Sequence, residues 1–162
     1  MQLDAEPLIE TLAEKIGALP AETALIGIHT GGVWVAERLH TRLGALVPLG
    51  KLAVTLHRDD FSKIGLHPTK KSTEMPFDVE GRDILLIDDV LNSGRTLRAA
   101  LNEIFDFGRP ASVKLAVLID RGRRELPFAA DFAGATMTLD AQQKLALRND
   151  NHHLRFDILN KP

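Results

Sequence analysis

The stretch ILLIDDVLNSGRT, residues 84–96, joins an apolar strand to a polar loop that opens a helix. A run such as ILLI is typical of a strand that is buried on both faces of a parallel sheet. Asp88 and Asp89 follow at the carboxyl end of this strand, which is the end where open α/β sheets bind their ligands. Adjacent side chains of an extended chain point to opposite faces, so the two carboxylates are not expected to form one acid–base pair. They are instead suited to two hydroxyls of one sugar, or to a magnesium ion bound through water.

The loop at residues 92–96, NSGRT, has the composition of an anion site. Backbone N–H groups at the start of a helix are free to bind an anion, and the helix dipole and two hydroxyl groups strengthen such a site. A ribose 5′-phosphate would satisfy both halves of the stretch, with its hydroxyls at the acids and its phosphate in the loop. The plain alternative is that the acids are exposed strand-end residues and that the loop is an ordinary N-cap, since both patterns are common.

The surrounding sequence alternates between strand and helix patterns. Apolar residues recur at helical spacing in three segments, and short apolar or alternating runs indicate strands between them. Alternation of this kind predicts an α/β fold with a mainly parallel sheet. The expected helices are residues 6–18, 33–43 and 96–107, and the expected strands are residues 23–28, 51–57, 83–88 and 113–120, with weaker strand-like pieces at 136–140, 144–148 and 154–159.

The segment RDDFSKIGLHPTKKSTEMPFD, residues 58–78, lacks a sustained period and carries two prolines and charges of both signs. Unstructured stretches of about 20 residues are uncommon in compact domains, where they are usually functional lids or disordered segments. We interpret this segment as a flexible lid.

Composition favours a single soluble domain over residues 1–162, because this length and an apolar fraction of 44% suit one core. The 20 basic and 22 acidic residues nearly balance, which excludes a global polycation for nucleic acid. Without cysteine, neither disulfides nor thiolate zinc sites can form. The N-terminus lacks a basic-then-apolar leader, and no apolar run reaches about 18 residues, so we expect a cytoplasmic protein without a membrane partner.

The stretch at residues 84–96 resembles the phosphoribosyl-diphosphate (PRPP) binding signature of type I phosphoribosyltransferases along its full length. Four longer stretches narrow the resemblance to the family of bifunctional pyrimidine (pyr) operon attenuation regulators and uracil phosphoribosyltransferases. They are GIHTGGVWVAERL (27–39), VTLHRDDFS (54–62), FDVEGRDILLIDDVLNSGRTLRAAL (77–101) and FGRPASVKLAVLIDRGRRELPFAADFAG (107–134). The similarity extends from about Ile26 to Gly134, and DRGRRELP is its most particular motif.

The resemblance implies the type I phosphoribosyltransferase fold, in which helices flank a mainly parallel central sheet. It also implies a small hood, formed mainly by the N-terminal region and residues 120–140, and a flexible lid loop at about residues 58–78. A homodimer or a larger homo-oligomer is expected.

The resemblance assigns roles residue by residue. Asp88 and Asp89 would bind the ribose hydroxyls and the magnesium ion that the substrate carries, and Arg58 would grip pyrophosphate from the lid. The other implied sites are the 5′-phosphate loop (Asn92, Ser93, Gly94, Arg95 and Thr96), the pyrophosphate loop (His29, Thr30, Gly31 and Gly32), the uracil-binding region (Asp120, Arg121 and Gly122) and an RNA-binding group (Arg121, Arg123 and Arg124). The family commonly has arginine where this chain has Gly31, and an arginine placed there is predicted to tighten PRPP binding.

The implied reaction joins uracil to PRPP and gives UMP and pyrophosphate. Pyrophosphate leaves C1′ with oxocarbenium-like character while uracil N1 attacks from the opposite face, so positioning and charge stabilisation supply the rate without a covalent nucleophile. Magnesium is the implied cofactor, and closure of the lid would exclude water. The second implied role is regulation of pyrimidine genes through binding of operon leader RNA.

Three classes of function remain open. The first is the enzyme, and the second is an RNA-binding attenuator that senses UMP or PRPP with weak or no turnover. The third is a phosphoacceptor domain whose acidic pair holds magnesium. The third is disfavoured because its acidic pair should follow the first strand, whereas LIDD follows two earlier strands.

Overall fold

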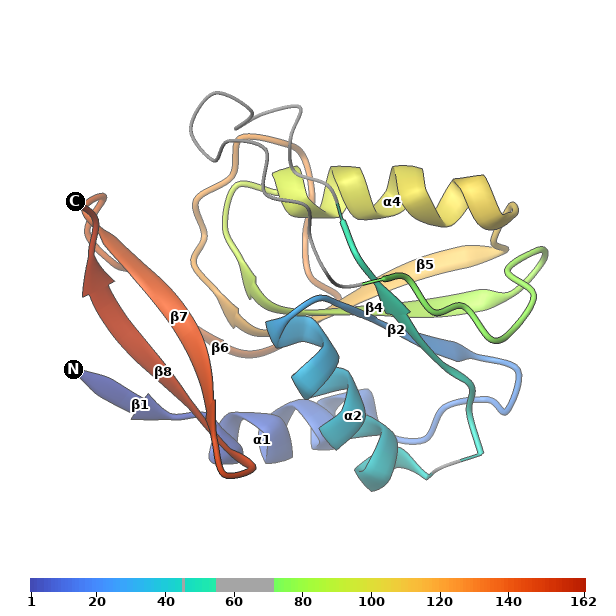
Figure 1. The fold of residues 1–162 in the computed structure, drawn as a ribbon, viewed down its shortest axis with the longest axis horizontal. Coiled ribbons are helices and arrows are strands. Elements are labelled where there is room, and N and C mark those ends of the chain that lie inside the picture. The colour runs from blue at the N-terminus through green and yellow to red at the C-terminus, as the bar shows by residue number, and fades with distance from the viewer. Residues whose placement is uncertain (45, 55–71) are drawn as a thin grey trace.

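The computed structural model describes residues 1–44, 46–54 and 72–162, which form two sheets with helices packed on the larger one (Figure 1). The larger sheet has five parallel strands in the order β3-β2-β4-β5-β6. These strands are β2 (Ala24–Ile28), β3 (Leu49–Leu52), β4 (Asp83–Leu91), β5 (Ser112–Asp120) and β6 (Phe132–Thr136). The helices of the described residues are α1 (Glu6–Ile16), α2 (Gly31–Leu43) and α4 (Arg95–Phe107).

Helices cover both faces of the five-stranded sheet, with α1 and α2 on one face and α4 on the other (Figure 1). Strand β4 shows why, because its successive side chains point alternately into two cores. Leu85 and Ile87 are buried in the core that α1 and α2 complete, whereas Ile84 and Leu86 are buried in the core that α4 completes. The α/β fold with a parallel sheet is therefore confirmed.

A close contact between β2 and α2 fixes where the first crossover begins. A Cβ added to Gly27 would lie 2.8 Å from the Ala36 Cβ and 2.8 Å from the Val33 Cα. Glycine in a strand commonly marks such a close approach of another backbone. Helix α2 therefore starts pressed against the sheet at the carboxyl end of β2.

The second sheet is antiparallel and has the strand order β1-β8-β7. Its strands are β1 (Gln2–Asp4), β7 (Gln143–Asp150) and β8 (His153–Asn160). The chain enters this sheet from the carboxyl end of β6, where the Met137 N–H donates to the Asp120 carbonyl at 2.9 Å. The small sheet therefore lies beside the carboxyl edge of the parallel strands (Figure 1).

Glu6 ties the small sheet to the helices. Its carboxylate accepts a hydrogen bond from the Arg38 guanidinium of α2 at 2.7 Å and from the Leu154 N–H of β8 at 3.0 Å. Burial would raise the pKa of Glu6, but the Leu154 N–H and the Arg38 charge outweigh it and hold that pKa below its ordinary value. One carboxylate thus connects α1, α2 and β8.

The expected helices and the strands at 23–28, 83–88 and 113–120 are present with small shifts of their ends. Strand β3 starts earlier than expected, and residues 55–57 of the predicted strand lie outside the described residues. The strand-like pieces at 144–148 and 154–159 fall within β7 and β8. The piece at 136–140 was placed wrongly, because the strand is β6 at residues 132–136.

Strand β1 pairs with β8 of the C-terminal hairpin, while α1 contacts β6, where the Lys15 ammonium donates to the Ala133 carbonyl at 2.7 Å. Residues 120–140 contain the end of β5, a loop, and β6. The hood expected from the N-terminal region and residues 120–140 stays a prediction. No helix in the described parts of the chain is both long and apolar enough to cross a membrane.

Candidate active site

Asp88 and Asp89 lie in β4 just after its pairing with the neighbouring strand β2 ends. Pairing of β4 with β2 stops at Ile87, whereas pairing with β5 continues beyond the two acids. The turn at residues 29–32, which leads into α2, therefore lies on one side of the acidic pair. The backbone fixes both carboxylates, because Asp88 Oδ1 accepts the Asp89 N–H at 2.9 Å and Asp89 Oδ1 accepts the Val90 N–H at 2.8 Å.

The Asp88 carboxyl is buried, with only 7% of the residue exposed. Burial raises its pKa well above the ordinary value, and the neighbouring Asp89 charge raises that pKa further. Such a carboxyl keeps its proton at a pH where exposed carboxyls have lost theirs. A cation or a hydroxyl donor that reached Asp88 would stabilise the charged form. The site therefore suits a ligand that brings hydroxyl groups or a bound metal ion.

Two glycines press the turn at residues 29–32 against the acidic pair. A Cβ added to Gly32 would lie 2.5 Å from the Ile87 carbonyl oxygen, and one added to Gly31 would lie 2.3 Å from Asp89 Oδ2. Glycine permits this close approach of backbone to neighbouring groups. His29 and Thr30 complete the turn, and the peptide bond between them is cis. The predicted pyrophosphate loop thus lies next to the acidic pair.

A cavity of about 170 Å³ lies between Asp88 and the start of α4. Gly94 is the N-cap of α4 and has a φ of 93°, a left-handed conformation that favours glycine. The first N–H groups of an α-helix have no carbonyl partner within the helix. The Arg95 N–H donates to Ser93 Oγ at 3.2 Å, which shapes the loop. The residues that line the cavity are Asp88, Val90, Leu91, Asn92, Ser93, Gly94, Thr96 and Leu97.

The Arg95 side chain is directed to the segment at residues 121–128, where its Nε donates to Glu125 Oε2 at 2.6 Å. This segment also bonds to the phosphate loop through its backbone. The N–H groups of Glu125 and Leu126 donate to the Ser93 carbonyl at 2.9 and 3.0 Å. The Arg95 guanidinium is therefore paired with Glu125, and Arg95 is not among the residues that line the cavity.

The predicted uracil-binding region holds one paired carboxylate and one buried cation. Burial would raise the pKa of Asp120, but the Arg124 guanidinium and the Gly122 N–H outweigh burial and hold that pKa below its ordinary value. Arg121 is buried, and its Nε has no hydrogen-bond partner in the described part of the chain. Burial lowers the pKa of the Arg121 guanidinium, and the Arg123 charge adds to this effect.

The three arginines predicted to bind RNA do not form one basic surface. Arg121 is only 6% exposed. The Arg124 guanidinium donates to the Phe128 carbonyl, the Asn92 carbonyl and the Asp120 carboxylate. Arg123 is exposed. Arg123 is therefore the one member of the three that is exposed, and RNA binding by this group stays a prediction.

The remaining predictions concern the lid and the metal ion. Arg58, the candidate for gripping pyrophosphate, lies outside the described residues. Within residues 1–44, 46–54 and 72–162, no group of three or more His, Asp and Glu side chains is placed to hold a metal ion. Magnesium is usually held by one or two carboxylates together with substrate phosphates. Asp88 and Asp89 fit this donor set.

Two features of the site were missed by sequence reasoning. The Asn92 Oδ1 atom is buried without a hydrogen-bond partner among the described residues. Arg124 bonds to Asp120 rather than to solvent, and the only signal was their i,i+4 spacing, which in a loop has no fixed geometry. Neither feature follows from the pattern of the chain, because both depend on how two loops meet.

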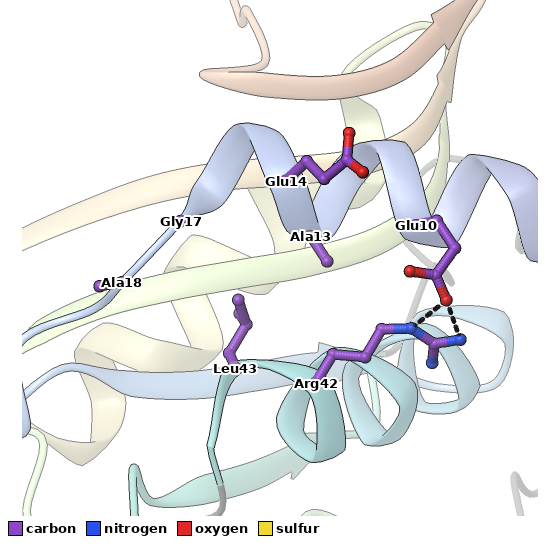
Figure 2. A pocket seen from close by; sticks show the side chains of 7 residues that line it. All are labelled: Glu10, Ala13, Glu14, Gly17, Ala18, Arg42 and Leu43. Carbon is purple, nitrogen blue, oxygen red and sulfur yellow. Dashed lines mark hydrogen bonds and ion pairs between the residues drawn. The ribbon is translucent and has the colours of Figure 1, made fainter.

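A second hollow, of about 360 Å³, lies between the last turns of α1 and α2 (Figure 2). Arg42 crosses it and pairs with Glu10, with Nε 2.6 Å from Oε1. Helix α2 begins at the candidate site with Gly31, and the helical rise places Arg42 roughly 17 Å further along. The hollow is therefore separate from the candidate site. Its lining is Glu10, Ala13, Glu14, Gly17, Ala18, Arg42 and Leu43.

Known proteins match this fold and most of the sequence. The family model of the phosphoribosyl transferase domain matches residues 2–142. A hypoxanthine-guanine phosphoribosyltransferase from Bacillus anthracis has a TM-score of 0.66 and 19% identity, covering 83% of this chain and 82% of that one. At that identity the likeness shows the fold alone, and it confirms the type I phosphoribosyltransferase fold.

Closer relatives share the name bifunctional protein PyrR. The protein from Ralstonia nicotianae is 46% identical, and the alignment covers 99% of this chain and 96% of the relative. The protein from Nitrosococcus oceani is 50% identical, with 98% of this chain and 93% of the relative covered. The chain therefore belongs to the phosphoribosyl transferase domain family and, within that family, to the PyrR proteins.

Proposed function

We propose that this protein is a magnesium-dependent uracil phosphoribosyltransferase, which converts uracil and PRPP to UMP and pyrophosphate. The observation that supports it most directly is one edge of the sheet, where the acidic pair, the turn at residues 29–32 and the phosphate loop adjoin. PRPP offers a group to each of the three, namely its ribose hydroxyls, its pyrophosphate and its 5′-phosphate. The choice of uracil rests on the family resemblance of residues 120–127.

Each part of the site has a distinct task in this reaction. The backbone N–H groups at the start of α4 hold the 5′-phosphate, and the glycine turn lets backbone N–H groups approach the pyrophosphate. Asp88 and Asp89 bind the ribose hydroxyls, so that C1′ is held between pyrophosphate and uracil. The C1′–O bond to pyrophosphate breaks, the C1′–N1 bond forms, and the N1 proton is released. Magnesium, when bound with PRPP, neutralises charge on the leaving group.

Product formation tests this proposal. Purified protein is incubated with PRPP, magnesium and one base at a time, and nucleotide and pyrophosphate are both measured. We expect equal amounts of UMP and pyrophosphate with uracil, and no nucleotide when magnesium is removed by a chelator. A clear preference for hypoxanthine or orotate over uracil would refute the choice of base.

A second function, regulation of pyrimidine genes through leader RNA, is supported by the relatives, whose name calls them bifunctional. The exposed Arg123 offers one contact to a phosphate. Binding is measured with a pyrimidine operon leader RNA and with a scrambled RNA of the same length, both in the presence of UMP. Equal affinity for the two RNAs would leave the enzyme as the only function.

We also propose that the protein acts in the cytoplasm as a homodimer or a larger homo-oligomer. Two aromatic residues of α4, Phe105 and Phe107, are 54% and 48% exposed. Aromatic side chains are enriched at protein interfaces. Sedimentation at micromolar concentration tests the proposal, and a purely monomeric mass would contradict it.

A further inference from the structure

Arg124 lies between two parts of the candidate site and bonds to both. Its Nη2 donates to Asp120 Oδ2 at 2.7 Å in the uracil-binding region, and its Nη1 donates to the Asn92 carbonyl at 3.1 Å in the phosphate loop. Its Nε donates to the Phe128 carbonyl at 2.7 Å. We call Arg124 with these three acceptors the arginine clamp. The side chain is 24% exposed, so most of it is shielded from water.

The residues that follow Arg124 form one wall of the phosphate loop. The N–H groups of Glu125 and Leu126 both donate to the Ser93 carbonyl. A Cβ added to Gly94 would lie 3.0 Å from the Phe128 ring and 3.4 Å from the Leu126 Cβ. The shape of the loop at Ser93 and Gly94 therefore depends on where the segment after Arg124 is held.

The clamp uses a property of arginine that lysine lacks. A guanidinium group is a rigid planar fork whose N–H groups point in several fixed directions, whereas an ammonium group is a single compact charge. Arg124 uses three of those directions, toward a carboxylate and two backbone carbonyls. A lysine at this position could not hold all three acceptors in the same arrangement.

We propose that Arg124 is a positioning residue that holds the base-binding region and the phosphate loop in a fixed arrangement with each other. This role rests on the proposed function and deepens it. Because all three polar nitrogens of Arg124 bond within the protein, the side chain acts through Asp120 and Asn92 rather than on a substrate. Without the clamp, residues 120–128 can shift against the phosphate loop. The affinity for a ligand that spans both regions should then fall most.

Two ligands distinguish a shift between the two regions from damage to the phosphate loop alone. UMP spans the base-binding region and the phosphate loop, whereas ribose 5-phosphate occupies only the phosphate side. Their affinities are measured by calorimetry for the parent and for Arg124→Gln and Arg124→Lys. We expect Arg124→Gln to weaken UMP binding by roughly 10- to 100-fold, the scale of a small misplacement in an active site. Ribose 5-phosphate should weaken by less than about threefold, because the bonds of Glu125 and Leu126 to Ser93 remain. Arg124→Lys should resemble Arg124→Gln more than the parent.

Arg98→Gln is the matched control, since Arg98 is an exposed arginine on α4 near the same loop. Its UMP affinity should stay within about twofold of the parent, as for most surface changes. A merely structural role for Arg124 predicts fewer folded molecules, which lowers the number of binding sites but leaves the affinity of each site unchanged. That result would overturn the proposal. Equal weakening of both ligands, or full activity of Arg124→Lys, would also overturn it.

The experiment distinguishes failure of the proposed reaction from failure of the proposed role of Arg124. A parent that binds UMP but does not form it from uracil and PRPP contradicts the proposed reaction, while the variants still decide the role of Arg124. A parent that binds ribose 5-phosphate but not UMP contradicts both proposals. In an active parent, the KM for uracil should rise with the loss of UMP affinity in Arg124→Gln.

Discussion

Replacing Asp88 with asparagine should make the protein relatively more stable at high pH and nearly inactive. Asp88 is buried, and burial together with the Asp89 charge raises its pKa well above the ordinary value. The folded state therefore opposes the loss of this proton, while the unfolded chain loses it at an ordinary pH. Asparagine keeps the oxygen that accepts the Asp89 N–H but carries no charge to bury.

The sign and size of the effect follow from the proton balance. Below the ordinary pKa of about 3.9, Asp88 is protonated in both the folded and the unfolded state and does not lower the free energy of unfolding. As the pH rises through the interval up to the raised folded pKa, the unfolded state ionises first, so the stability of the parent falls. Each unit of pKa difference costs about 1.4 kcal/mol at higher pH. For a domain of this length, each kcal/mol corresponds to roughly 2–4 °C in Tm.

Thermal unfolding of the parent and of Asp88→Asn, followed from pH 4 to pH 8, measures this difference. The Tm of the variant relative to that of the parent should rise by several degrees over this range. A buried amide that lacks an acceptor costs roughly 1–3 kcal/mol, but this cost is the same at each pH and leaves the trend unchanged. Asp106→Asn, on the exposed side of α4, is the control for the loss of one carboxylate.

A constant Tm difference between Asp88→Asn and its parent across this range would refute the raised pKa. Activity gives an independent check, because Asp88 is proposed to touch the ribose and the magnesium ion. UMP formation by Asp88→Asn should fall by roughly 10²-fold or more, the scale seen when a charge-stabilising group is removed. Normal turnover by this variant would remove Asp88 from the site.

Four further predictions concern other residues. Gly32→Ala should destabilise the fold by roughly 1–3 kcal/mol in urea unfolding, because the new Cβ would lie 2.5 Å from the Ile87 carbonyl; unchanged stability would contradict the close packing of this turn. The sequence alone predicts that Gly31→Arg tightens PRPP binding. The structure predicts weaker binding in calorimetry, because the new Cβ would displace the Asp89 carboxylate. Tighter binding would show that Asp89 moves freely. Glu6→Gln should lower the free energy of unfolding by about 1–3 kcal/mol at pH 7, because it weakens the hydrogen bonds from Arg38 and Leu154. Since the pKa of Glu6 is lowered in the folded state, this difference should vanish as the pH falls through that folded pKa. A difference that persists in acid would refute the charge effect. Arg123→Gln should flatten the salt dependence of leader RNA binding by about one unit or less, and an unchanged slope would remove Arg123 from the RNA interface.

The strands and helices with strong local patterns were predictable from the sequence. Strand β4 carries an apolar run that is buried on both faces, and α4 has apolar residues at helical spacing, so both agree with the structure. The acidic pair at the carboxyl end of β4 and the polar loop that opens α4 also followed from their order along the chain. These features depend on local sequence, so a single sequence is enough to predict them.

Strand β6 could not be predicted, because its sequence FAGAT reflects tertiary packing rather than strand propensity. A Cβ added to Gly134 would lie 2.7 Å from the Leu118 carbonyl oxygen and 3.0 Å from the Leu8 carbonyl oxygen. The strand is therefore squeezed between β5 and α1, which selects small residues and hides the usual pattern. Strand β1 was also missed, since three residues are too short for a pattern.

The roles of the three arginines at 121, 123 and 124 show the same limit within the site. Sequence reasoning treated them as one basic cluster, because charged side chains are usually solvated. In the structure Arg121 is buried, and Arg124 is bonded to Asp120 and two carbonyls. The difference depends on how residues 120–128 meet the phosphate loop, which no spacing along the chain reveals.

Formation of UMP by the purified protein decides whether this site carries the proposed reaction. Uracil, PRPP and magnesium are supplied together, and UMP and pyrophosphate are measured for the parent and for Asp89→Asn. We predict that the parent releases UMP and pyrophosphate in equal amounts, and that the variant is slower by roughly 10²-fold. No UMP from the folded parent at saturating PRPP would show that the protein does not catalyse this reaction, and equal rates for parent and variant would show that Asp89 is not part of the site.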